Sequence, residues 1–77
     1  MNDLCEKILK VLVVEMTDIT GRSVINHFSQ KIGKDAMTLE RADLPKFSKA
    51  LLESIFLFSD PEKARRISRE MKALASE

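Results

Sequence analysis

The sequence predicts an all-α fold, a compact bundle of four short helices. Three observations lead to this prediction. Apolar residues recur at steps of three and four along nearly the whole chain, and no alternating apolar and polar run is long enough for a sheet. The two glycines and two prolines lie at the boundaries between these periodic stretches. The chain has 77 residues, so we expect a single all-helical domain spanning residues 1–77.

The first helix is expected over residues 2–16, with Asn2 or Asp3 as its N-cap. Its main apolar face contains Leu4, Ile8, Val11 and Leu12. Residues 11–14 are apolar on nearly every side, which indicates that this part of the helix contacts other structure on two faces. A turn is expected at residues 17–21, where Thr17 or Thr20 can accept hydrogen bonds from the first N–H groups of the next helix.

The second helix is expected over residues 22–32, with an apolar stripe of Val24, Ile25, Phe28 and Ile32. Gly33 suits the left-handed position that follows many helix ends. Beyond it, Met37 and Leu39 are candidate core anchors, and the segment near residues 37–42 has room for an extra helical turn.

Asp43 and Pro45 indicate the start of the third helix, because aspartate caps helices well and a first turn tolerates proline. Asp60 and Pro61 mark the start of the fourth helix in the same way. Its apolar stripe contains Ala64, Ile67, Met71 and Leu74, and its opposite face carries Arg65, Arg66, Arg69 and Lys72. Ion pairs at four-residue spacing are expected between Glu62 and Arg66 and between Arg66 and Glu70.

The composition limits the classes of protein to which the chain can belong. Hydrophobic residues are 44% and charged residues 32%, as in folded globular domains, and the net charge of +1 lacks the basic excess of dedicated nucleic-acid binders. One cysteine excludes an internal disulfide, and one cysteine with one histidine cannot complete a zinc site, so we expect no metal and no cofactor. No apolar run is long enough to span a membrane, and the first residues lack a secretory pattern, so we expect a cytoplasmic protein.

The sequence predicts no enzymatic activity. Asp35, Glu40, Asp43 and Glu53 are scattered over turns and polar faces, and no catalytic motif includes them. His27 and Lys31 share a helix face, as in histidine-phosphotransfer helices, but those helices place the lysine three residues after the histidine rather than four. A phosphorelay role is therefore a third-ranked hypothesis, and we expect His27 to face solvent.

The first functional hypothesis is a non-catalytic interaction or regulatory module. The helices expected first and third carry broader apolar faces than a small bundle needs, so part of these faces can remain exposed as an association site. We therefore predict a protein partner or a homodimer, and no small-molecule substrate. The predicted partner-binding residues lie off the main apolar stripes and are Leu9, Val13, Leu52 and Phe56.

The alternative hypothesis is a small helix-turn-helix DNA-binding regulator, which makes nucleic acid the second-ranked partner. Ser29 precedes Gly33 by four residues, as the small residue precedes the turn glycine in such motifs. The second helix of the motif would then span residues 36–44. The DNA-binding residues in this hypothesis are Lys34, Arg41 and Lys46.

A resemblance to a known kind of protein module rests on three stretches: "GRSVINHFSQKIG", "DLPKFSKALLESIFLF" and "EKARRISREMKAL". Together they resemble a small all-helical module of prokaryotic proteins that sometimes stands beside signalling or regulatory domains. The resemblance covers most of the chain, but it consists of caps and core spacing and brings no catalytic residue with it. It implies an accessory or regulatory interaction role.

Overall fold

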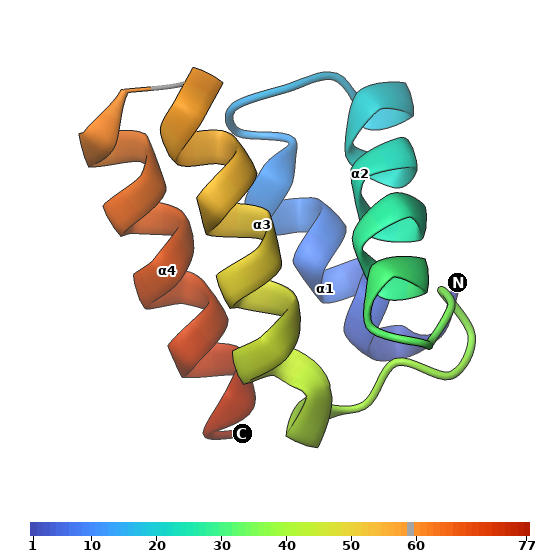
Figure 1. Ribbon diagram of the computed structural model, residues 1–77. Coiled ribbons are helices and arrows are strands. Elements are labelled where there is room, and N and C mark those ends of the chain that lie inside the picture. The colour runs from blue at the N-terminus through green and yellow to red at the C-terminus, as the bar shows by residue number, and fades with distance from the viewer. Residues whose placement is uncertain (59) are drawn as a thin grey trace.

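The computed structural model describes the backbone of residues 1–58 and 60–77 and the side chains of residues 1–54 and 60–77. The helices are α1 (Asp3–Leu12), α2 (Asp18–Lys31), the short 3-10 helix η1 (Arg41–Asp43), α3 (Leu44–Phe58) and α4 (Pro61–Ala75). Successive α-helices run alternately up and down (Figure 1). Helices α1 and α3 each contact both α2 and α4, so the four α-helices form a closed ring. The predicted all-α bundle is confirmed, with η1 as the extra helical turn near residues 37–42.

The core fills the space inside this ring, and every α-helix contributes to it. Its buried side chains belong to one cluster: Leu4, Cys5, Ile8, Leu9, Leu12, Ile25, Phe28, Leu39, Leu44, Phe47, Leu51, Ile67, Met71 and Leu74. The apolar stripes predicted for the first, second and fourth helices therefore face inward, although Val11, Val24 and Ile32 are only partly buried against the cluster. Removing these side chains from water is the main favourable contribution to folding in a bundle of this size.

Helix α1 begins as predicted but ends four residues earlier than expected. The Asn2 side chain accepts a hydrogen bond from the Cys5 N–H at 2.9 Å, which caps the first turn. The helix ends at Leu12, and Val13 and Val14 beyond it are exposed. β-branched valines have a lower helix propensity than most residues, and because Val13 and Val14 are exposed, little burial favours another helical turn.

Helix α2 begins at Asp18, so the expected turn over residues 17–21 is wrong except at its first residue. The Thr17 hydroxyl accepts a hydrogen bond from the Thr20 N–H at 3.2 Å and caps the helix. Gly21 is buried inside the helix, where a Cβ atom would lie 2.8 Å from Cδ1 of Leu9. This glycine therefore permits a close approach of α1 and α2. Gly33 does occupy the left-handed region, with φ of 81°, as predicted.

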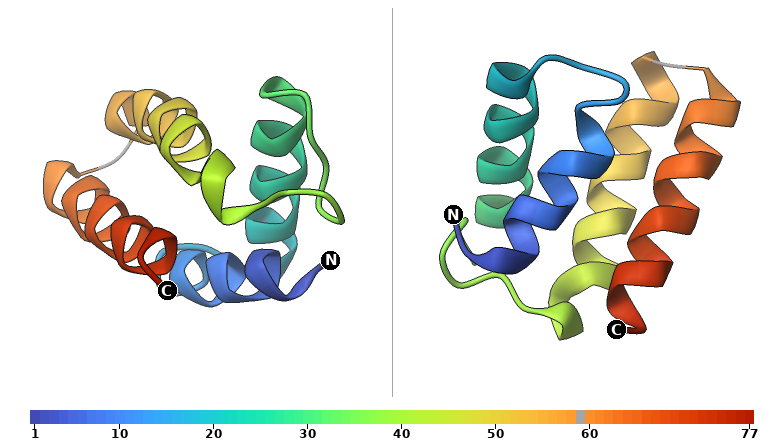
Figure 2. Two further views of the ribbon diagram at one scale, coloured as in Figure 1. Left: turned by 90° about the horizontal axis from the view of Figure 1, so that it is seen from below. Right: turned by 180° about the vertical axis from the view of Figure 1, so that it is seen from behind.

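The connection from α2 to α3 is held by short-range hydrogen bonds. The Asp35 carboxylate accepts from the N–H of Met37 at 2.8 Å and of Thr38 at 3.0 Å, and these bonds lower the pKa of Asp35. The N-terminus is tied to the same loop, because the Asn2 side chain donates to the Leu39 carbonyl at 2.8 Å. Both ends of the chain lie near this end of the bundle (Figure 2).

Three predictions for this connection are wrong. Met37 was expected to anchor the core together with Leu39, but Met37 is 65% exposed and only Leu39 of this pair is buried. No helix spans residues 36–44, where the helix-turn-helix hypothesis needs its second helix, because the segment forms turns followed by η1. Asp43 was expected to cap the third helix, but its carboxylate instead accepts from the Glu40 N–H at 2.9 Å and closes a capping box around η1.

Helix α4 starts as predicted, since the Asp60 side chain accepts from the Glu62 N–H at 2.8 Å and Pro61 follows as the first helical residue. The ion pairs expected along this helix are not formed. Arg66 instead donates to the Glu15 carboxylate at 3.1 Å and to the Val11 carbonyl at 2.8 Å. Val11 lies in the last turn of α1, where carbonyl groups lack helical partners, so this longer-range contact satisfies an otherwise open acceptor.

Candidate functional site

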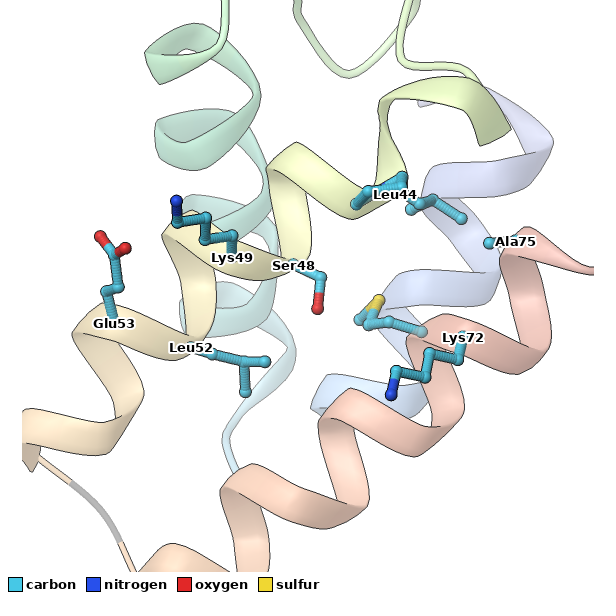
Figure 3. A pocket seen from close by; sticks show the side chains of 9 residues that line it. Leu44, Ser48, Lys49, Leu52, Glu53, Lys72 and Ala75 are labelled. Atoms are coloured by element: carbon cyan, nitrogen blue, oxygen red, sulfur yellow. The ribbon is translucent and has the colours of Figure 1, made fainter.

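An apolar groove runs between α3 and α4 and has a volume of about 770 Å³ (Figure 3). It is open to solvent along one side, and apolar atoms form nearly all of its surface. The groove is lined by Leu44, Pro45, Ser48, Lys49, Leu52 and Glu53 of α3 and by Met71, Lys72 and Ala75 of α4. Its volume lies in the range of known binding clefts.

The groove is present because the side chains between the outer edges of α3 and α4 are small, while the large side chains lie deeper. Ser48 and Ala75 are too short to fill the space between the outer edges of the two helices. Leu44 and Met71 lie beneath them and are each only 1% exposed, so they form the floor. Leu52 is half-buried and extends from α3 toward α4 in Figure 3. A ligand in this groove would therefore contact mainly Pro45, Leu52 and Ala75, because Leu44 and Met71 are almost fully covered.

Among the described residues, the charged side chains of the groove stand at its rim. Figure 3 shows Lys49 and Glu53 on the edge of α3 that faces away from α4, and Lys72 beside the gap on α4. All three residues are exposed. A binding partner must therefore combine an apolar contact surface with polar or charged groups at its margins.

The predicted partner-binding residues do not form one surface. The prediction that Leu9 binds a partner is wrong, because its side chain is only 5% exposed and packs against Gly21 in the core. Val13 is 40% exposed at the end of α1, but it does not line the groove. Leu52 does line the groove, whereas the side chain of Phe56 lies outside the described residues.

Two of the three residues in the DNA-binding hypothesis are engaged by carboxylates. Lys34 lies 3.7 Å from Asp43, and Arg41 lies 3.1 Å from Glu77. Lys46 is exposed at the start of α3. The structure therefore does not present these three cations on a helix that could enter a DNA groove.

The groups with potential for chemistry lie apart from the groove. His27 is exposed, as predicted, and its ring packs edge-on against Phe28 with centroids 4.8 Å apart. Cys5 is buried in the core, where burial raises the pKa of its thiol and keeps it protonated at neutral pH. Among the described residues, no group of three or more His, Cys, Asp and Glu side chains could hold a metal ion.

Within residues 1–58 and 60–77, no helix is both long and apolar enough to cross a membrane. Comparisons of the chain with protein-family models, curated proteins and solved structures find no match. A functional proposal must therefore rest on the geometry of the groove.

Sequence reasoning identified one residue of this groove, Leu52, from its position off the main apolar stripe. Ser48 lies four residues before it, and this small residue one turn from an off-stripe leucine was the available indication of a gap. The contribution of α4 could not be found this way. Met71 belongs to the regular core stripe, and only its position opposite α3 makes it part of the groove floor.

Proposed function

We propose that this protein is a non-catalytic protein-interaction module and that the groove between α3 and α4 is its docking surface. The observation that carries the proposal is an apolar groove of about 770 Å³ whose described charged residues stand at its rim. Short apolar faces of partner proteins commonly bind in such grooves between helices. A regulatory or accessory role in the cytoplasm is part of this proposal.

The arrangement of the groove supports protein docking over catalysis. Among the described residues, its polar side chains are Ser48, Lys49, Glu53 and Lys72. Neither His27 nor Cys5 lines it, and in the part of the chain that the structure describes the Ser48 hydroxyl forms no hydrogen bond with a base that could activate it as a nucleophile. We therefore make no second functional proposal, because the ion pairs of Lys34 and Arg41 give no support to DNA binding.

A photocrosslinking experiment tests the proposal. A photoreactive residue replaces Ser48 in the groove, and in a matched protein it replaces Ser23, which is exposed on α2. Both proteins are irradiated in living cells, and the crosslinked peptides are identified by mass spectrometry. We expect position 48 to capture one defined segment of a protein, and a further Leu52→Asp substitution to abolish this capture while the circular dichroism spectrum stays unchanged.

Other crosslinking results would change or contradict the proposal. Crosslinks from position 48 to a second copy of this chain would identify the groove as a self-association site. Crosslinks that are the same at positions 48 and 23, or that persist in the Leu52→Asp protein, would show that the groove is not a docking surface and would contradict the proposal.

A further inference from the structure

We propose that the occupant of the groove is an amphipathic helix of another protein whose apolar stripe is flanked by acidic residues. This inference rests on the proposed function above and adds the chemistry of the partner. It follows from the shape of the groove, from the charge along its two edges and from the charge of the rest of the chain.

The shape of the groove suits one helix. The walls of the groove are themselves two helices, and their lining residues recur at steps of three and four, as in Ser48 and Leu52 on α3 or Lys72 and Ala75 on α4. Ridges on a third helix with the same spacing can pack between such walls. The accessible apolar lining of Pro45, Leu52 and Ala75 would contact the apolar stripe of that helix, and its flanking residues would lie over the rim.

Two lysines line the groove, Lys49 on α3 and Lys72 on α4, and three further exposed cationic residues stand near them by helical spacing. Helical spacing places Arg65 on the same stripe as Lys72, two turns away, with Arg69 beside them. Lys49 lines the edge of α3, and Lys46 lies one turn before it. All five cationic side chains are exposed, and among the described residues none of them forms an ion pair.

Acidic residues along these edges are fewer. Glu53 lines the groove on α3, and Glu62 lies at the start of α4 next to the stripe of Arg65. The lining therefore holds two lysines against one glutamate, and the three exposed cationic residues near it outnumber Asp60 and Glu62, although the net charge of the whole chain is only +1. Such an uneven distribution favours a partner with carboxylates at matching positions, because complementary rim charges increase both the association rate and the specificity.

The same charges disfavour a second copy of this chain as the occupant. A two-fold symmetric dimer through the groove would place the cationic edges of one copy against those of the other. A head-to-tail arrangement would need an apolar helix face flanked by acids. The exposed face of α1 instead mixes Asp3 and Glu6 with Lys7 and Lys10. We therefore infer a different protein chain as the partner.

A displayed peptide library tests this inference. The library consists of amphipathic helices with a varied apolar stripe and with Glu, Gln or Lys at the flanking positions. Selection uses the intact wild-type protein, after the library has been depleted of binders to the Leu52→Asp variant. We expect enrichment of helices with Glu at the flanks and binding that weakens as salt concentration rises.

Charge reversal provides the matched control. Lys49→Glu with Lys72→Glu changes the rim, whereas Lys10→Glu with Lys31→Glu makes the same change in net charge on exposed residues of α1 and α2. We expect the rim variant to bind the enriched peptide at least about tenfold more weakly and the control variant less than about threefold more weakly. Selection against the rim variant should shift the preferred flanks from Glu toward Lys.

Four results would overturn the inference. Enrichment of Gln or Lys flanks on the wild-type protein, or equal weakening by both double variants, would show that the rim charges do not select the partner. The proposed docking function would survive either result, because it is judged separately by crosslinking from position 48. Absence of any Leu52-dependent helix from the library would exclude a helical occupant. Leu52-dependent binding to phosphatidylglycerol vesicles, with no binding of Glu-flanked helices, would instead identify a lipid surface as the partner.

Discussion

Helices α1 and α2 pack so closely that Gly21 stands directly against the side chain of Leu9, and both residues are buried. Helices α3 and α4 also make an extensive contact, yet they leave a groove of about 770 Å³ along their outer edges. Small residues occur in both regions with opposite effects. Gly21 faces its neighbour and lets the helices approach, whereas Ser48 and Ala75 line the outer part of the contact between α3 and α4, where their short side chains leave a groove open.

Within one small bundle, the closed contact between α1 and α2 mainly stabilises the fold, whereas the open groove between α3 and α4 is the surface proposed for binding. A closed contact contributes most when every atom is packed, so its residues are sensitive to small changes in volume. An open groove contributes less to folding, so its residues are free to serve a partner. Substitutions of matched residues on the two sides of this comparison should therefore differ in their effect on the free energy of unfolding.

The largest difference is expected between two adjacent leucines of α3. Leu51 is 0% exposed in the core, and its replacement by alanine should cost about 2–5 kcal/mol. Leu52 is half-buried in the groove, so Leu52→Ala should cost about 1 kcal/mol or less. Urea denaturation followed by circular dichroism measures both values. Equal losses would mean that Leu52 is packed as tightly as the core and that the groove is closed in solution.

The closed contact can be broken at its glycine. Gly21→Val adds a branched side chain where even a Cβ would lie 2.8 Å from Leu9, so we expect a loss of about 2–3 kcal/mol from overpacking. Ser23→Val is the control, because it places the same side chain on the exposed face of α2. It should cost less than about 1 kcal/mol, the range of helix propensity. If the two valine variants unfold at the same urea concentration, the close contact is absent.

A polar contact at the end of α1 should have a smaller effect. Arg66→Ala removes two hydrogen bonds, to the Val11 carbonyl and to Glu15, and we expect a loss of about 1–2 kcal/mol. Arg65→Ala is the matched control, since Arg65 is exposed and its neighbour in sequence. Thermal unfolding of both variants compares them. A larger loss from Arg65→Ala would contradict the longer-range role of Arg66.

The sequence predicts the helices better than the contacts between them. The caps at Thr17 and Asp60 and the helix end at Gly33 are local features, and their chemistry identifies them directly. Gly21 was interpreted as part of a turn because glycine usually interrupts helices. Its function in the fold depends on Leu9, which lies on another helix, and no local pattern contains that information.

The same limit applies to the candidate site. Leu52 stood out because it lies off the main stripe, but Leu9 has the same property and is buried. Distance from a stripe therefore does not distinguish an exposed residue from one covered by a neighbouring helix. Arg66 shows the same limit for polar contacts. Local spacing predicted ion-pair partners on its own helix, but Arg66 contacts Glu15 and the Val11 carbonyl instead.

The smallest predicted effect concerns the end of the bundle opposite the Arg66 contact. The Glu77 carboxylate accepts hydrogen bonds from Lys7 at 2.9 Å and from Arg41 at 3.1 Å, and these bonds lower the pKa of Glu77. The pKa in the folded state is then below that in the unfolded state. The stabilisation is therefore fully present above the unfolded pKa and is lost as the pH falls through the folded pKa.

Replacing this carboxylate should remove that pH dependence. Because the ion pairs are exposed, Glu77→Gln should change Tm only slightly at neutral pH and should flatten the decrease in Tm at acidic pH. Glu70→Gln is the control, since Glu70 is exposed and makes no ion pair with the described residues. Thermal unfolding over a series of acidic buffers compares the two variants with the wild-type protein. A profile of Glu77→Gln that matches the wild type throughout would mean that Lys7 and Arg41 do not hold this carboxylate in solution, and that the end of α4 is free of α1.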